Sequence, residues 1–473
     1  MNGNLLFVGG DLSGIQKFIY NISSKKAMVS LKGRSAYLKE LTEKVCAKIL
    51  NIDEIKNSSQ NRDEMQIYCS GGKFYLQVPD TETIRLKIDE IKYNTEEKLW
   101  KEHYGQLSIN IGYVPFRYQN ELVNVNGETG NIGILWRNIT EQFAQLKNQK
   151  FKNILSNSFD SFFKVTETGG DVKVCAITGI ESSYCVKIDK KEGEGDEIWV
   201  LPTVEAHIRK GQDLRKAQHF KTLEEYAQKS YLGVLRMDVD GLGKRFIQSG
   251  FKNISEYRKF SKKLDDFFGI ELQKYQDTDE FRNDLNIVYA GGDDIFVVGK
   301  WNKVIDFAEK VRTEFQKYIS DASLSISGGI AVVSPKFPIA KAAKFAGDAE
   351  DKAKDYNHGQ KNAFCMFNTA ISWEKEFEYV KRYKIRLFDL CNKDNMPRSI
   401  LHKIMLFAEM KQRGELKYIW HTAYYFKRFK ESKSQIIIDF CNELEKELYN
   451  NTKAYDLLAL SARWAELELK EVK

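Results

Sequence analysis

A long internal repeat is the feature that most constrains how this chain of 473 residues can fold. Residues 5–20, LLFVGGDLSGIQKFIY, and residues 232–247, LGVLRMDVDGLGKRFI, share one plan: an apolar strand, an aspartate, a glycine turn and the start of a helix. A second pair of similar segments follows each of these, SGGKFYLQV at 70–78 and AGGDDIFVV at 290–298. Two glycines between β-rich segments predict a hairpin of two strands. The simplest explanation is two copies of one α+β unit.

The segments outside the repeat predict two further parts. A polar, charge-rich stretch between the copies, KIDKKEGEGDEIWV, follows Cys175 and Cys185 and is typical of a small insert. From about residue 371, apolar positions recur at the three- and four-residue spacing of helices. We therefore expect the first copy over 1–150, the insert over 151–230, the second copy over 231–370 and an all-α domain over 371–473.

Composition limits the environment and the partners of the chain. No apolar run approaches the roughly 18 residues that a membrane span needs, so we expect a cytoplasmic protein without a membrane partner. Seven scattered cysteines do not form a disulfide framework. The net charge of +7 is modest for this length, so any site for a polyanion must be local. One candidate is 411–433, which mixes lysine and arginine with aromatics and is compatible with RNA contact; the alternative is a solvated helix face.

Three aspartates form the strongest candidate for a catalytic site. Asp238 lies near the end of an apolar strand, and Asp293 and Asp294 lie at the turn of the second hairpin. If these strands are neighbours in a sheet, the three carboxylates converge at one edge, which suits Mg²⁺ and a triphosphate substrate. Gly291 and Gly292 would let that substrate approach the backbone. The alternative is that Asp-Asp after Gly-Gly only makes a good turn.

These segments resemble a known family, the large polymerase-cyclase subunit of type III CRISPR effector complexes, in its Csm-type version. The resemblance rests on YAGGDDIFVVG, LRMDVDGLGKRF, GDLSGIQKFIY, LKGRSAYLKELTE and SGGKFYLQV, and it covers most of the chain. It implies two ferredoxin-like palm domains, related to GGDEF cyclases, that face each other. The GGDD palm would make cyclic oligoadenylates from ATP when target RNA is bound. The implied partners are guide RNA, target RNA and the other subunits of the complex.

The resemblance also implies roles for individual residues. Carried over by position, Asp238, Asp293 and Asp294 would be catalytic and would hold two Mg²⁺ or Mn²⁺ ions, with Val239 at the same metal site. The segment AEDKAKDYNHGQKNAFCMF resembles the part of GGDEF cyclases whose lysine and arginine hold the triphosphate. The expected nucleotide-binding residues are Asp11, Ser13, Gly14, Gly71, Gly72, Gly291, Gly292, Lys354 and Lys361.

The two copies differ at the hairpin that carries the acids. Where the second copy has Asp293 and Asp294, the alignment of the double glycines gives the first copy Lys73 and Phe74. A cation and an aromatic cannot ligate magnesium, so we expect one catalytic centre per chain. The first copy would instead hold a second nucleotide, or it is a decayed duplicate kept only for packing.

The sequence departs from the family's pattern in two ways. None of the six histidines is followed by an aspartate, so the His-Asp pair of the HD nuclease domain is absent and we expect no cleavage of single-stranded DNA by this chain. Relatives often carry four zinc-binding cysteines in the insert, whereas CAITGIESSYC offers only Cys175 and Cys185. A closed zinc site needs four ligands, and His207 alone does not complete it, so we expect no zinc.

Four functions remain open from the sequence. The leading hypothesis is a metal-dependent nucleotidyltransferase that makes cyclic oligoadenylates inside an RNA-guided antiviral complex. A variant adenylates another acceptor, because a metal site fixes the phosphoryl chemistry and says little about the acceptor. The others are a stand-alone GGDEF-like cyclase and a non-enzymatic scaffold for RNA and partner subunits.

Overall fold

The computed structural model describes most of the chain, and the following account is confined to those residues. They are 4–22, 27–58, 62–119, 121–124, 129–130, 132–162, 173–175, 177–182, 185–188, 198–200, 222–228, 230–247, 251, 253–431, 433–451 and 453–472. By contacts between residues the chain divides into two units, Met1–Ser325 with Val333–Lys344, and Ile326–Val332 with Phe345–Lys473. The four domain boundaries expected from the sequence stay a prediction.

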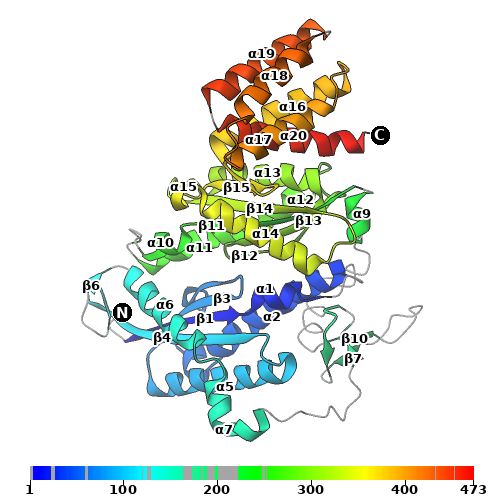
Figure 1. Cartoon of the computed structure of the whole chain (residues 1–473). Helices are drawn as coiled ribbons and strands as arrows, with labels where there is room; N and C mark the ends of the chain where they lie inside the picture. The colour runs from blue at the N-terminus through cyan, green and yellow to red at the C-terminus, as the bar shows by residue number, and fades with distance from the viewer. Residues whose placement is uncertain are drawn as a thin grey trace. The chain divides into compact units, whose positions relative to one another are not determined.

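The first copy of the repeat builds a six-stranded sheet (Figure 1). In the order in which the strands are hydrogen-bonded, they are β2 (Gln66–Ser70), β3 (Lys73–Pro79), β1 (Leu5–Ser13), β4 (Ser108–Gln119), β5 (Glu121–Asn124) and β6 (Thr129–Gly130). The helices of this copy are α1 (Ile15–Tyr20), α2 (Ala27–Leu50), α3 (Asp53–Lys56), α4 (Arg62–Met65), α5 (Glu82–His103), α6 (Gly133–Lys147) and α7 (Lys152–Phe162). Strand β1 is antiparallel to both its neighbours and is buried along nearly its whole length, which explains its continuous apolar run.

The second copy builds a sheet with the same order of strands. The strands are β12 (Leu285–Gly291), β13 (Asp294–Lys300), β11 (Leu232–Asp240), β14 (Ser325–Val333), β15 (Ala363–Met366) and β16 (Thr369–Ser372). The helices are α10 (Leu242–Ile247), α11 (Ile254–Asp266), the π-helix η2 (Phe267–Glu271), α12 (Leu272–Gln276), α13 (Trp301–Ile319), α14 (Ile339–Lys354) and α15 (Tyr356–Gly359). In both sheets the first four strands follow the ferredoxin-like order, in which the first and third strands are central neighbours. The predicted α+β fold class is confirmed.

The two copies match down to an irregularity in one strand. A β-bulge interrupts β2 between Gln66 and Tyr68, and a bulge interrupts β12 between Ile287 and Tyr289. A bulge changes the twist of a hairpin and is not produced by a general strand pattern. The shared bulge therefore identifies equivalent positions in the two hairpins.

The insert is described only in part. It contains β7 (Lys173–Val174), β8 (Glu181–Ser182), β9 (Val186–Ile188), β10 (Ile198–Val200) and, before the second copy, α9 (Leu223–Ala227). Strand β7 pairs with β8, and β9 pairs with β10. Cys175 and Cys185 are buried free thiols, and His207 lies outside the described residues.

The C-terminal helices pack around a core of their own (Figure 1). They are the π-helix η3 (Trp373–Phe377), α16 (Glu378–Asn392), α17 (Ser399–Gln412), α18 (Tyr418–Lys430), α19 (Gln435–Asn450) and α20 (Ala454–Glu471). On α18, Trp420 and Tyr424 are exposed, and the Arg428 guanidinium lies 5.6 Å from the Tyr424 ring centre. RNA contact at this segment stays a prediction. None of the described helices combines the length and apolarity that a bilayer span requires.

Candidate functional site

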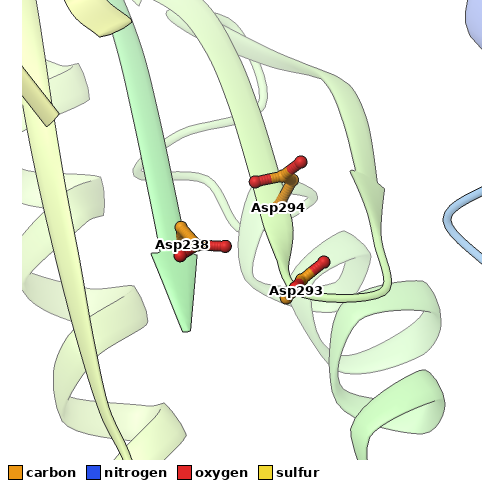
Figure 2. A group of neighbouring side chains, drawn as sticks. All are labelled: Asp238, Asp293 and Asp294. Atoms are coloured by element: carbon orange, nitrogen blue, oxygen red, sulfur yellow. The ribbon is translucent and has the colours of Figure 1, made fainter. Parts of the chain in front are cut away.

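The three predicted aspartates lie together at one end of the second sheet (Figure 2). In the register of the sheet, Asp238 of β11 is the direct partner of Asp294 at the start of β13. Asp293 occupies the turn before β13, and its carbonyl oxygen accepts a hydrogen bond from the Val239 backbone N–H at 3.1 Å. One ligand atom from each carboxylate lies within 4.8 Å of the others. The expected convergence of these three side chains is therefore present.

The chemistry of this cluster suits a hard divalent cation. It offers only carboxylate oxygens, which are the donors that Mg²⁺ and Mn²⁺ prefer. The three residues are half-buried, so solvent or substrate oxygens can reach an ion held between them. Within the part of the chain that the structure describes, this is the single group of three or more acidic, histidine or cysteine side chains close enough to hold a metal. The backbone of Val239 is adjacent, and its predicted role as a metal ligand stays a prediction.

The register corrects the alignment of the two hairpins by one residue. In the first copy both glycines, Gly71 and Gly72, form the turn, with φ of 59° and 79°. In the second copy Gly291 still belongs to β12, and the turn consists of Gly292 and Asp293. Lys73 is the partner of Asp11, as Asp294 is of Asp238. Lys73 is therefore the residue of the first copy equivalent to Asp294, and Gly72 is equivalent to Asp293.

Lys73 reaches from the first copy into the acidic cluster of the second. Its Nζ lies 3.9 Å from Oδ2 of Asp293, with 42% of the lysine side chain and 31% of the aspartate side chain exposed. Burial lowers the pKa of Lys73, but the carboxylates around it, Asp293 first, raise it by more, so its pKa lies above the ordinary value. The ammonium group is therefore fully charged at neutral pH. Sequence reasoning treated Lys73 only as a residue that cannot bind a metal and missed this contact.

The two glycine turns touch each other through their backbones. A Cβ atom at Gly71 would lie 2.9 Å from the Gly291 carbonyl oxygen and 2.9 Å from Cα of Gly292. On the other side, a Cβ at Gly292 would lie 3.2 Å from the hydroxyl of Tyr68. Close packing of the two turns therefore requires glycine at these positions, whereas the sequence suggested that glycine lets a phosphate approach the backbone. Their role in nucleotide binding stays a prediction.

Three predicted residues of the first copy lie at the end of β1. Asp11 is buried and forms an ion pair with Lys147 of α6, with Oδ2 and Nζ 2.7 Å apart. The Asn110 side chain donates to Ser13 Oγ at 2.9 Å. Gly14 has φ of 93°, and a Cβ there would lie 2.1 Å from the Gln106 carbonyl oxygen, so no other residue fits without a shift.

A cavity of about 370 Å³ lies between the two copies and is lined by residues of both. Its charged lining residues are Asp11, Lys73, Lys147 and Asp293. Its aromatic wall crosses from one copy to the other, because Trp136 of α6 stacks on Phe246 of α10 with ring centres 5.1 Å apart. The volume and the mixture of aromatic walls with few charges are typical of sites for small organic ligands.

Two further predicted residues belong to the other unit. Lys354 forms an ion pair with Glu350, at 2.6 Å, and lies at the end of α14. Lys361 follows α15 with φ of 61°. Their predicted binding of a triphosphate stays a prediction.

Known protein families match both halves of the repeat. The family model described as "Csm1 subunit domain B" matches residues 4–168, and "Cas10/Cmr2, second palm domain" matches residues 231–365. Relatives named "CRISPR system single-strand-specific deoxyribonuclease Cas10/Csm1 (subtype III-A)" are 28% identical in Enterococcus italicus and 25% identical in Mycobacterium tuberculosis. These alignments cover 85% and 80% of this chain but 59% and 56% of the relatives. The chain thus spans less than two thirds of the length of these curated relatives.

Solved structures share the fold. The chain resembles an apo Csm1-Csm4 cassette with a TM-score of 0.69 at 20% identity, covering 98% of this chain and 70% of that one. The same values describe its likeness to a Csm1-Csm4 cassette in complex with cA4. A cassette in complex with AMPPNP gives a TM-score of 0.66 at 18% identity, with coverage of 98% and 70%.

Proposed function

The chain belongs to the Cas10/Csm1 family of CRISPR subtype III-A, and we propose from this premise that it makes cyclic oligoadenylates from ATP. It is a palm-domain subunit of the nucleotidyltransferase type. The proposed complex contains a Csm4-like subunit, other subunits, guide RNA and target RNA, and acts in the cytoplasm. Solved relatives described with Csm4, cA4 and AMPPNP support this proposal.

The observation that carries the proposal is the position of the acidic cluster beside the cavity. Asp293 belongs to both, so a metal held by Asp238, Asp293 and Asp294 would lie at the cavity's edge. Bound divalent ions would supply the charge that activates a ribose hydroxyl and stabilises the leaving pyrophosphate. The overall step forms a bond from a 3′-oxygen to an α-phosphorus and breaks the α–β phosphoanhydride, and it releases pyrophosphate and one proton.

The cavity wall supplies the features that a nucleobase requires. Trp136, Tyr75 and Phe246 present aromatic surface, on which a base can stack. The Trp136 indole N–H is buried and has no acceptor among the described residues. A buried donor without a partner beside a cavity is a position where a ligand or a water completes the hydrogen bond.

The test is nucleotide synthesis by the chain in its complex. Radiolabelled ATP, target RNA and Mg²⁺ or Mn²⁺ are incubated with the wild type and with Asp293→Ala/Asp294→Ala, and products are separated and identified. We expect the double variant to fold and assemble but to make no product, because turn acids at a sheet edge contribute little to the core. The matched control is Asp279→Ala/Glu280→Ala, an exposed pair of adjacent acids before β12, which should keep full activity.

Two outcomes would change the proposal. Undiminished product from Asp293→Ala/Asp294→Ala would exclude this cluster as the catalytic site. A linear or mixed product that contains another nucleoside would replace the cyclic oligoadenylate with adenylation of a different acceptor. Cleavage of single-stranded DNA is not part of the proposal, since the sequence has no adjacent His-Asp pair.

A further inference from the structure

Lys73 belongs to the first copy of the repeat, and its side chain lies beside the acidic cluster of the second copy. It begins β3 of the first sheet, directly after the turn formed by Gly71 and Gly72. Its Nζ lies 3.9 Å from Asp293 of the second copy, and it lines the cavity together with that residue. The candidate metal-binding cluster of carboxylates therefore has a positively charged neighbour from a part of the chain more than 200 residues away.

The backbone fixes the place of this cation. The turn that precedes Lys73 contacts the turn that precedes Asp294, because Gly71 lies against the backbone of Gly291 and Gly292. Strand β3 continues from Lys73 into the centre of the first sheet, where it pairs with β1. The backbone of Lys73 is thus fixed by the first sheet and by the contact of the preceding turn with the second copy, and its side chain can move between nearby oxygens.

Charge counting indicates what the ammonium group can bind. The three carboxylates bring three negative charges, and a nucleoside triphosphate brings roughly four more, against about four positive charges from two divalent ions. Polyphosphate oxygens would then remain in excess of cations at the site. Phosphoryl-transfer sites commonly use a lysine or arginine to neutralise that excess.

Lys73 is better placed for this role than the other lysine of the cavity. Lys147 lies 2.7 Å from the buried carboxylate of Asp11, which is a close ion pair that a phosphate would have to break. The 3.9 Å separation of Lys73 from Asp293 is at the outer limit of an ion pair, and both side chains are partly exposed. Moving Lys73 from a carboxylate to a phosphate therefore has a low cost.

We infer that Lys73 of the first copy binds the phosphates of the nucleotide whose α-phosphorus reacts at the second copy. The inference rests on the proposed function and adds a residue from the first copy to that site. With nucleotide and metal bound, the ammonium group moves from Asp293 to the terminal phosphates and stabilises the charge that develops on the departing pyrophosphate. The first copy then contributes to catalysis directly, although it has no metal ligands of its own.

The experiment measures binding separately from synthesis. The full chain in its complex is titrated with AMPPNP in the presence of Mn²⁺, as the wild type, Lys73→Met and Lys73→Arg. We expect Lys73→Met to weaken AMPPNP binding by about 10- to 100-fold, the range for loss of a charged hydrogen bond. Lys73→Arg keeps the charge and should recover most of the affinity. Lys87→Ala, which removes an exposed lysine of α5 paired with Glu90, is the matched control and should bind as the wild type does.

A second titration separates phosphate binding from a structural role. Mn²⁺ binding without nucleotide is followed by electron paramagnetic resonance, and Lys73→Met should bind Mn²⁺ at least as tightly as the wild type, because a competing cation is gone. Weaker binding of both Mn²⁺ and AMPPNP would mean that Lys73 only supports the fold of the site, and unchanged or tighter AMPPNP binding would also overturn the inference. Equal weakening by Lys73→Arg would exclude a role for the charge. These titrations remain decisive even if the wild-type complex makes no oligoadenylate, an outcome that counts only against the proposed function.

Discussion

The side chain of His103 is a buried titratable group of the first copy. It is 3% exposed, and its Nε2 lies 2.5 Å from the hydroxyl of Tyr37. Its ring also meets Phe18 edge to face, with ring centres 5.2 Å apart. Burial, followed by the positive charges of Arg34 and Lys98, lowers the pKa of His103 to about 4. The folded protein therefore keeps this imidazole neutral.

This shift predicts a loss of stability in acid. Between the unfolded pKa near 6.5 and the folded pKa near 4, the unfolded chain binds a proton that the folded chain does not, so stability is complete above pH 6.5 and falls as the pH drops toward 4. The His103 contribution to this loss is roughly 3 kcal/mol. Thermal unfolding of the wild type and His103→Gln from pH 7.5 to 4 should show a shallower decline in the variant. The same slope in both proteins would contradict the assignment.

Single residues also show what sequence alone could and could not predict about the site. The sequence predicts that Asp238, Asp293 and Asp294 converge, because each lies at a recognisable strand end or turn, provided that the strands are neighbours. The pairing of β11 with β13 meets that condition. The contacts of Lys73 and Trp136 could not be predicted from the sequence, because they join segments far apart in the chain and depend on how the two copies pack. No local pattern distinguishes a lysine that meets a distant carboxylate from a solvated one.

Among the elements, the β2–β3 and β12–β13 hairpins differ by one residue in the position of their turns, which a comparison of the two sequences cannot detect. Both hairpins contain Gly-Gly, and aligning these glycines makes Lys73 equivalent to Asp293 in sequence. The structure makes Lys73 equivalent to Asp294, because the two-residue turn begins one position later in the second copy. The hairpins and the α+β class follow from apolar strand-like segments, turn glycines and the repeat, and the ferredoxin-like strand order follows from the family resemblance. Register depends on the tertiary contacts of each turn.

Gly71 provides a test of the contact between these hairpins. Its φ of 59° and the 2.9 Å approach to the Gly291 carbonyl oxygen mean that Gly71→Ala meets both backbone strain and a clash. The matched control is Gly414→Ala, where φ is 73° and no described atom lies within 4 Å of the added Cβ. Each variant should lose about 1–2 kcal/mol from the left-handed conformation.

The two variants should differ in function. Gly71→Ala should also weaken AMPPNP binding and nucleotide synthesis, since the clash displaces Lys73 from Asp293. Gly414→Ala should change only thermal stability. If both variants lose the same stability and keep full binding and synthesis, the hairpin contact is not needed to build the site.

On the scale of the molecule, the two copies of the repeat pack reciprocally. Helix α2 of the first copy contacts β12 of the second, and α11 of the second contacts β2 of the first. One hydrophobic cluster contains both Trp136 of the first copy and Tyr257 of the second. The arrangement is that of a twofold dimer whose halves belong to one polypeptide.

Covalent linkage of those halves has a consequence for mass action. A cavity built between two separate protomers is lost on dilution below their dissociation constant, whereas a cavity built within one chain persists at any protein concentration. Specific synthesis rate and AMPPNP affinity should therefore stay constant when the pre-formed complex is diluted from micromolar to low nanomolar concentrations under conditions where its other subunits remain bound. A specific rate that falls in proportion to concentration would instead indicate that the working site forms between two chains, as in a cyclase that must dimerise.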